Sequence, residues 1–272
     1  MEYYSQELIE AFDQQNFAFI EVEVKEHVCY ITLDREEKKN AIHPQMVFEL
    51  AYVFQYVMAQ SSIWICVMQA KGNVFCAGAD LKAFMGGGAP HDSSIPKPEQ
   101  EVLIGPMFHS LHKPMIARVN GDVYAGGFFF LTGSHIVLAS DHIKLGLPEV
   151  KRGLYPFQVM AELQRVMPTR KVLDWCIRGY TLPVTAAAQY GLLTKVVSVD
   201  QLDQEVEAVI AELKGNSPMA MRLGLEAFQH TNSSESDHAY LSAMLGKAVG
   251  SKDGQEGLRA FREKRKPNWT GQ

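Results

Sequence analysis

The feature that most constrains the fold is a pair of strand-length apolar runs that each give way to very small residues. Residues 63–68 form an uninterrupted apolar run, which is typical of a strand covered on both faces. Four residues with almost no side chain, 76–79, follow after a short connection. A second, largely apolar run at 115–119 leads to another small-residue turn at 125–127. Each turn would let a ligand approach the main chain, and two such turns could place two backbone N–H groups on one oxygen atom.

Either turn by itself is equally compatible with a tight connection between packed elements, because glycine interrupts chains in any fold. The surrounding residues are more specific. The sequence reads Phe-Cys-Ala-Gly-Ala-Asp-Leu at 75–81, Ala-Arg-Val-Asn-Gly at 117–121 followed by Gly-Gly, and Leu-Gly-Leu-Pro-Glu-Val at 145–150. In this order and spacing, the three segments resemble the signatures of the enoyl-CoA hydratase/isomerase (crotonase) superfamily. The resemblance runs from about Ala18 to the end of the chain.

Strands and helices alternate through the first part of the chain, which predicts an α/β fold with right-handed crossovers. The resemblance implies more, namely a crotonase-like spiral of repeated ββα units with a C-terminal helical region. We expect a loosely held N-terminal arm at 1–17 and the spiral core, with the CoA-binding and active site, at 18–196. A helical oligomerisation region at 197–272 would follow. The chain is long enough for one domain with a sizeable core.

Local patterns predict individual elements of the core. Apolar alternation at 19–24 and the run at 27–33 predict a hairpin, and helical spacing predicts a helix at 44–58. The stretch 86–96 is rich in glycine, proline and serine, which predicts a mobile loop before a helix at 99–112. That loop either gates an acyl pocket or is plain surface disorder.

Beyond Pro168 the pattern becomes helical. The apolar side chains of these helices either pack on their own core or form an oligomer interface, and the resemblance implies a homotrimer or a dimer of trimers. The expected helices cover residues 170–177, 185–190, 199–213, 218–229 and 236–249, and the candidate interface residues are Met219, Met221, Leu241, Met244 and Leu245.

Composition and charge argue against several classes of protein. A formal net charge of -5 gives no electrostatic case for nucleic-acid binding. The four cysteines stand in apolar or small-residue contexts without a C-x-x-C pair, which predicts reduced thiols rather than disulfides or zinc. His109 and His112 have no third ligand in sight, so a surface or interface role is favoured over metal binding. The polar, acidic start and the lack of a long apolar run favour a cytoplasmic protein without a membrane partner.

The chemistry that the resemblance implies places negative charge on a carbonyl oxygen. Removing a proton next to a thioester carbonyl, or adding a nucleophile to its conjugated double bond, produces an enolate. Two preorganised N–H donors stabilise an enolate, and loss of one such donor typically costs ~3 kcal/mol. By position, the matching pair is the N–H of Ala77 and the N–H of Gly126. The dipole of the helix that follows Gly126 would contribute further.

Glu149 is the predicted acid/base. Its apolar neighbours, Leu147 and Val150, suit a general base that works near neutral pH, although a solvent-facing loop carboxylate is the plain alternative. Enoyl-CoA hydratases usually carry a second glutamate, whose position falls on Phe129 in this sequence. One carboxylate suffices to take a proton from C2 and return it at C4. The pattern therefore favours a Δ3,Δ2-enoyl-CoA isomerase.

The resemblance also implies which segments hold CoA. No separate cofactor is expected, because CoA is part of the acyl-CoA thioester substrate. Two lysines in a charged loop would lie along the CoA phosphates, although a solvated loop explains them equally well. The tail would touch the adenine end of CoA, often from the next subunit. The residues are Lys38, Lys39 and Ala41 in the loop, Ala79, Asp80 and Leu81 after the first small turn, and Phe261 and Lys264 in the tail.

Other interpretations stay open. Residues 155–160 are bulkier than the glycine-rich segment usual in hydratases, which reshapes the acyl pocket. A water held by Glu149 alone, or by Gln158, would still permit hydration. Other enolate chemistry such as decarboxylation is a third alternative within the enzyme class. A catalytically silent acyl-CoA-binding or scaffold protein is favoured by Phe129 alone, and the retained Glu149 weighs against it.

Overall fold

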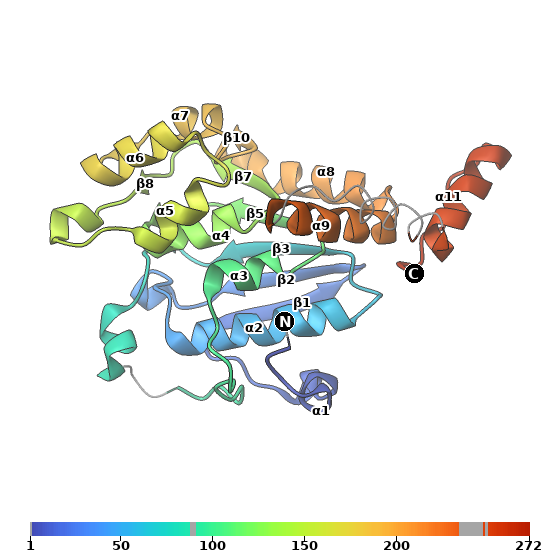
Figure 1. The fold of residues 1–272 in the computed structure, drawn as a ribbon, viewed down its shortest axis with the longest axis horizontal. Helices are drawn as coiled ribbons and strands as arrows, with labels where there is room; N and C mark the ends of the chain where they lie inside the picture. Colours follow the sequence, from blue (N-terminus) through green and yellow to red (C-terminus); the bar gives the residue numbers. More distant parts are fainter. Residues whose placement is uncertain (1, 88–90, 234–246, 248–249) are drawn as a thin grey trace.

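Two β-sheets frame the fold in a computed structural model that describes residues 2–87, 91–233, 247 and 250–272 (Figure 1). The larger sheet has the order β1-β2-β3-β5-β7-β10, and the smaller has the order β4-β6-β8-β9. Neighbouring strands are parallel except in the pairs β1–β2 and β8–β9. The larger sheet contains β1 (Ile20–Lys25), β2 (Val28–Leu33), β3 (Ile65–Ala70), β5 (Met115–Val119), β7 (Ile136–Ser140) and β10 (Lys195–Val197). The smaller contains β4 (Val74–Cys76), β6 (Asp122–Tyr124), β8 (Leu145–Gly146) and β9 (Thr181–Leu182).

From β3 to β8, consecutive strands alternate between the two sheets, and this alternation builds the spiral of ββα units. β3 lies in the larger sheet, β4 lies in the smaller sheet, and the short helix α3 (Ile104–His109) follows them. The pairs β5–β6 and β7–β8 repeat the pattern, followed by α4 (Phe128–Thr132) and α5 (Phe157–Leu163). The expected α/β class and the ββα spiral are confirmed.

The apolar run at 63–68 becomes β3, which is buried on both faces as predicted. Cys66 and Met68 belong to the main core, together with residues of α2 (Pro44–Ala59). Ile65 and Val67 point to the opposite face, where they join a second apolar cluster. Side chains alternate between the two faces of a strand, so a strand covered on both faces needs apolar residues at successive positions.

The second cluster is closed by α8 (Leu202–Lys214), one of the helices for which packing on the core and an oligomer interface were the two alternatives. Its buried residues Leu202, Val206 and Ile210 recur at helical spacing and pack against the larger sheet. This helix is therefore part of the core rather than a free interface element.

The N-terminal segment is packed against α2, so the expectation of a loosely held arm is wrong. Tyr4 and Ile9 are buried, the latter in α1 (Gln6–Glu10). The side-chain oxygen of Gln55 accepts a hydrogen bond from the Tyr4 N–H at 3.0 Å. The ring of Phe12 stacks on Tyr56 with 3.7 Å between ring centroids. These contacts make the segment a cover for the outer side of α2.

The predicted hairpin and the helix at 44–58 are confirmed, but the predicted helix at 99–112 is too long. α3 spans only Ile104–His109. Pro106 fits the first turn of this helix, and residues 99–103 before it are bends and irregular chain. Before it, π-helical η3 (Ala83–Gly87) occupies part of the expected mobile loop. The end of that loop is held, since Ile95 is buried and its carbonyl accepts from the Gln45 side chain at 2.7 Å.

The remaining helices lie after the core strands. They are α6 (Thr169–Arg178), α7 (Val184–Gln189), α9 (Pro218–Ser233) and α11 (Lys252–Glu263). Of the predicted helix at 236–249, only Lys247 is among the described residues. The candidate interface residues Leu241, Met244 and Leu245 lie outside them.

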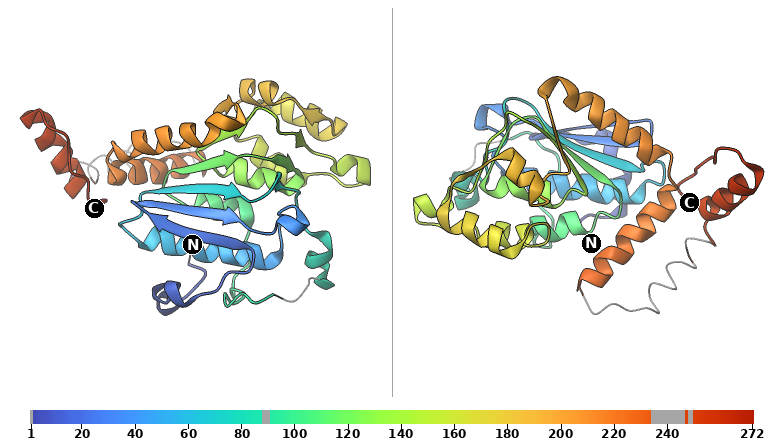
Figure 2. Two further views of the ribbon diagram at one scale, coloured as in Figure 1. Left: turned by 180° about the vertical axis from the view of Figure 1, so that it is seen from behind. Right: turned by 90° about the horizontal axis from the view of Figure 1, so that it is seen from above.

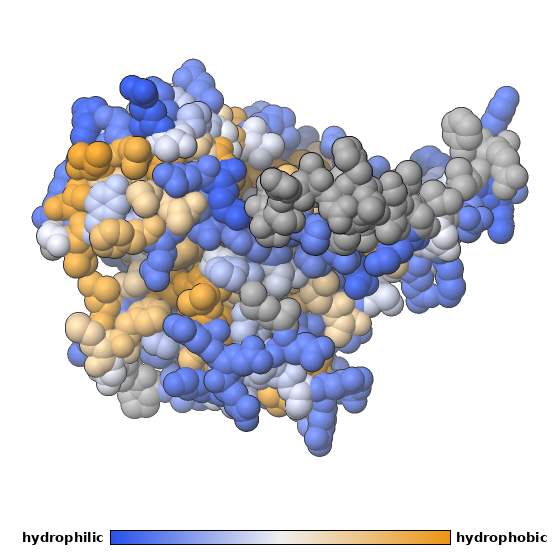
Figure 3. All heavy atoms as spheres, viewed as in Figure 1, coloured by the Kyte–Doolittle hydropathy of each residue, from blue (hydrophilic) through white to orange (hydrophobic). Residues whose placement is uncertain are grey.

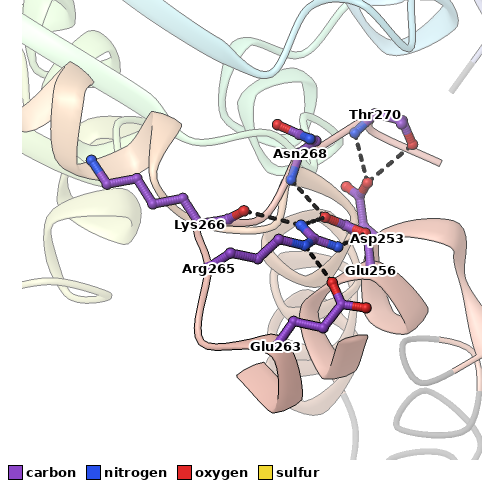
Figure 4. Close-up of polar contacts among 7 residues, drawn as sticks. All are labelled: Asp253, Glu256, Glu263, Arg265, Lys266, Asn268 and Thr270. Atoms are coloured by element: carbon purple, nitrogen blue, oxygen red, sulfur yellow. Dashed lines mark hydrogen bonds and ion pairs between the residues drawn. The ribbon is translucent and has the colours of Figure 1, made fainter. Parts of the chain in front are cut away.

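The C-terminal tail folds back and is tied to the start of α11, which projects from the rest of the molecule (Figure 2). The buried carboxylate of Asp253 accepts hydrogen bonds from the Thr270 N–H at 2.7 Å and the Gly271 N–H at 3.1 Å. Arg265 pairs with Glu256 at 2.6 Å (Figure 4). The position of the tail is thus set by contacts within this one chain.

Candidate active site

Three small-residue or acidic segments leave one edge of the smaller sheet. β4, β6 and β8 are parallel neighbours, so their carboxyl ends lie side by side. β4 continues into residues 77–80, β6 into 125–127 and β8 into 147–149. The carboxyl edge of parallel strands is where ligands bind in open α/β sheets. The topology therefore gathers Gly126, Glu149 and the first small turn at one edge, although they are far apart in the sequence.

The first two turns approach each other so closely that Gly78 admits no side chain. Its φ of 94° lies in the region that favours glycine. A Cβ at Gly78 would overlap the Ala125 side chain and lie 3.2 Å from the Gly126 nitrogen. Gly78 thus allows the main chain of 78–79 to lie against the start of the short 3₁₀ turn η4 (Ala125–Gly127).

Ala77 does not supply the second donor, which corrects the prediction from sequence. Its N–H donates a hydrogen bond to the Lys39 carbonyl at 3.0 Å. Gly78 and Asp80 both form backbone hydrogen bonds with Ile42. The Ile42 N–H donates to the Gly78 carbonyl at 2.8 Å, and the Asp80 N–H donates to the Ile42 carbonyl at 2.9 Å. The N–H groups of Ala77 and Asp80 therefore both face the 35–42 loop.

In this turn, the N–H of Ala79 rather than that of Ala77 is positioned as the second donor. Ala79 pairs with Ile42 as an isolated parallel bridge in which its own polar groups face away from Ile42. Within the described part of the chain, its N–H donates to no backbone carbonyl. A Cβ at Gly126 would lie 3.5 Å from the Ala79 nitrogen. Gly126 is the second residue of η4, where an N–H has no acceptor inside the turn. The structure brings together Ala79 and Gly126 as a pair of donors.

The pair lies on the wall of a cavity of about 750 Å³, a size typical of sites for small ligands. The other lining residues come mostly from α2, α3, α4 and α5 and from the segments 81–84 and 97–103, and more than half of them are apolar. Leu81, Phe84 and Leu103 line it while remaining 49 to 56% exposed. Figure 3 shows apolar surface over this side of the molecule. The lining residues used below are Ala79, Leu81, Gly105, Gly126, Phe129, Gln158 and Glu162.

Glu149 begins the 3₁₀ helix η5 (Glu149–Arg152), which follows β8 after Leu147 and Pro148, and it is half-buried. It is close enough to Cys176 to affect that thiol: burial first, and then the Glu149 charge, raise the pKa of Cys176 to about 11. Glu149 is not among the residues that line the cavity. The sheet topology brings it to the same edge as the donor pair.

The loop expected to hold CoA is fixed by two buried polar residues that sequence reasoning missed. Arg35 pairs with Asp80 at 2.9 Å and donates to the Ala41 carbonyl at 2.9 Å. Asn40 is fully buried and donates to the carbonyls of Lys71 and Val74. Partial burial by itself would raise the pKa of Asp80, but hydrogen bonds from the Ala83 N–H and Arg35 outweigh it and lower the pKa. Asp80 is therefore bonded to the 35–42 loop through Arg35.

The other predicted CoA contacts divide into two groups. Lys38 and Lys39 are exposed on the loop next to Ala41, close to the donor pair through the Lys39 carbonyl. Phe261 lies in the last turn of α11 and Lys264 directly follows the helix, which is at the opposite end of the molecule from α5 and η3 (Figure 1). One chain alone does not bring these two residues to the cavity.

The histidines of α3 also differ from expectation. His109 Nε2 lies 2.9 Å from Glu162 Oε2, so His109 is part of a side-chain pair instead of a free surface group. No group of three or more potential metal ligands occurs among the described residues. In the same part of the chain, no helix has both the length and the apolar character needed to cross a bilayer.

Comparison with known proteins gives consistent matches over nearly the whole chain. A model of the enoyl-CoA hydratase/isomerase family matches residues 23–272. Mevalonyl-coenzyme A hydratase of Aspergillus fumigatus is 30% identical over 251 residues, which cover 89% of this chain and 91% of the relative. Enoyl-CoA hydratase EchA19 of Mycobacterium tuberculosis is 31% identical over 255 residues, covering 91% and 95%. A crystal structure of an enoyl-CoA hydratase/isomerase from Mycobacterium paratuberculosis superimposes with a TM-score of 0.82 at 27% identity, covering 94% of this chain and 100% of the other.

Proposed function

The chain belongs to the enoyl-CoA hydratase/isomerase family, and from this premise we propose that it adds water to the double bond of a 2-enoyl-CoA thioester, or removes water in the reverse reaction. The observation that carries the proposal is the pair of N–H groups of Ala79 and Gly126 on the wall of one cavity. Placed on the thioester carbonyl oxygen, two such donors stabilise the negative charge that develops during addition at C3.

Hydration is favoured over isomerisation by two observations. The relatives described above are named hydratases. The cavity wall also contains polar side chains from α5, Gln158 among them, so a water has hydrogen-bond partners there. Our interpretation of the sequence favoured isomerisation because Phe129 replaces a glutamate, and Phe129 does line the cavity. Isomerisation of 3-enoyl-CoA is therefore the second candidate function.

Glu149 is proposed to exchange the proton at C2 in either reaction. In hydration it would give a proton to C2 after the water oxygen bonds to C3. In isomerisation it would take a proton from C2 and return it at C4. Its place at the same sheet edge as Ala79 and Gly126 supports this role.

The proposal also covers CoA binding and assembly. The exposed Lys38 and Lys39 are proposed to meet the CoA phosphates beside the 35–42 loop. A trimer or a dimer of trimers would bring Phe261 and Lys264 of one chain near the cavity of the next. Light scattering of the purified protein tests this, and a monomer at micromolar concentration would contradict it.

The test of the reaction uses the unmodified protein with 2-enoyl-CoA and 3-enoyl-CoA thioesters of several chain lengths. Mass spectrometry separates the outcomes, because hydration adds the mass of water whereas isomerisation leaves the mass unchanged. We expect the 2-enoyl thioesters to be hydrated faster than the 3-enoyl thioesters are isomerised. Isomerisation that is faster by about tenfold or more would replace the hydratase proposal by the isomerase.

A further inference from the structure

α5 carries a carboxylate to the cavity wall, and no motif in the sequence marks it. Glu162 lines the cavity that contains Ala79 and Gly126. Gln158 precedes Glu162 by four residues, so the two side chains lie on one face of the helix. Phe129 lines the same cavity from α4. The wall is therefore apolar on the α4 side and polar on the α5 side.

The position of the Glu162 side chain is fixed by its neighbours. The side chain is 14% exposed, and its Oε2 lies 2.9 Å from His109 Nε2 and 3.8 Å from Arg165 Nε. Its Oε1 lies against Gly105, where a Cβ would overlap the carboxylate. A carboxylate has acceptor sites on both oxygens. With Oε2 facing His109 and Arg165, Oε1 is left for a group in the cavity.

An ion pair that only joins α3 to α5 would explain the contact between His109 and Glu162. It would not explain why Gly105, which also lines the cavity, leaves room at Oε1. A purely structural ion pair also leaves unexplained why a second polar side chain, Gln158, lines the cavity from the same helix face. Partly buried ion pairs also stabilise proteins little, because the charges lose hydration. These features together favour a ligand-binding role.

We propose that Glu162 binds the water that adds to C3 and accepts its proton. The inference rests on the proposed hydratase function. The water oxygen bonds to C3 as its proton passes to Glu162, and the electron pair of the C2=C3 bond moves toward the thioester carbonyl. The enolate oxygen is held by the N–H groups of Ala79 and Gly126, and Glu149 then gives a proton to C2. Glu162 returns its proton to Glu149 through bulk water, so the net change is the addition of one water.

His109 is a positioning residue in this scheme, because it touches Glu162 and not the substrate. Its imidazole holds Oε2 and so orients Oε1 toward the cavity.

The test separates water addition from enolate formation. Exchange of the C2 hydrogens of butyryl-CoA with heavy water needs only the oxyanion donors and Glu149, whereas hydration of crotonyl-CoA also needs the attacking water. Glu162→Gln should lower the hydration rate by about 100-fold or more while C2 exchange stays within about threefold. Glu205→Gln is the matched control, since Glu205 is a partly buried glutamate paired with Lys195 at 2.7 Å away from the cavity. Both of its rates should stay within about threefold of the parent.

Hydration by Glu162→Gln within about threefold of the parent would overturn the inference, as would equal loss of hydration and exchange in a folded variant. If Glu162→Gln does not fold, Glu162→Asp replaces it in the test, because it keeps the carboxylate beside His109 and shortens the side chain. The rates of hydration and of C2 exchange are then compared in the same way. A parent that exchanges C2 hydrogens without hydrating crotonyl-CoA contradicts the proposed hydratase function, and this inference with it. A parent that does both, with no selective effect at Glu162, contradicts this inference alone.

Discussion

The guanidinium of Arg35 lies 2.9 Å from the carboxylate of Asp80, and this pair joins the 35–42 loop to the segment that carries one oxyanion donor. Arg35 is 5% exposed and also lies over the ring of Phe19. The loop that Arg35 holds contains Lys39, whose carbonyl accepts a hydrogen bond from the Ala77 N–H. The choice of Ala79 over Ala77 as donor therefore depends on this loop being in place.

Arg35→Met should destabilise the protein by about 3 kcal/mol, because Asp80 would keep its charge without its partner. The free energy of unfolding from urea denaturation measures this. Arg178→Met is the control, since the pair of Arg178 with Asp174 is largely exposed and should contribute less than about 1 kcal/mol. Equal effects of the two substitutions would contradict a structural role for the Arg35–Asp80 pair.

Gly78→Ala should lower turnover by about 100-fold, because the added methyl group overlaps Ala125 and separates the two turns that carry the donors. Gly86→Ala is the control: its φ of 83° is also positive, but no atom lies within 4 Å of its Cβ position. Any cost of the backbone conformation is then common to both variants. Turnover that falls equally in both would show that the close approach of the turns does not matter.

The strands and the sheet edge could be predicted from the sequence because they depend on local patterns. Burial on both faces requires apolar residues at successive positions, and β3 has them. The donor at Ala79 could not be predicted, because it depends on the contact between Lys39 and Ala77, which are remote in the sequence. Glu162 was missed for a similar reason: only the packing of α3 and α5 places its carboxylate opposite Gly105.

His43 should make the stability of the protein depend on pH in the weakly acidic range. Its Nδ1 accepts a hydrogen bond from the Gln45 N–H at 3.0 Å, which caps the start of α2 and requires the neutral ring. Burial, then Arg35 and His91, lower the pKa of His43, while Asp80 acts in the opposite direction. The folded state therefore binds the proton less well than the unfolded chain. The stabilisation is complete above the unfolded pKa of about 6.5 and is lost as pH falls below it.

His43→Asn keeps a capping side chain that does not titrate. We expect unfolding free energies measured at about pH 7.5 and pH 5.5 to differ by about 1 kcal/mol more for the parent than for this variant, which is the typical contribution of a cap. An identical pH dependence in the two proteins would contradict the assignment.

Glu149→Gln should abolish the exchange of C2 hydrogens in butyryl-CoA, because the amide keeps the shape of the side chain but cannot take up a proton. The loss should be at least about 100-fold. Hydration should fall with exchange, since Glu149 acts at C2 in both, and this distinguishes it from Glu162, where only hydration should fall. Binding of CoA and the free energy of unfolding should be unchanged.

Asp141→Asn is the control, because Asp141 is an exposed acid that follows β7 in the larger sheet and leaves the smaller sheet untouched. Exchange by Glu149→Gln within about threefold of the parent would remove Glu149 as the base. A carboxylate on the cavity wall, such as Glu162, would then have to act at C2 instead.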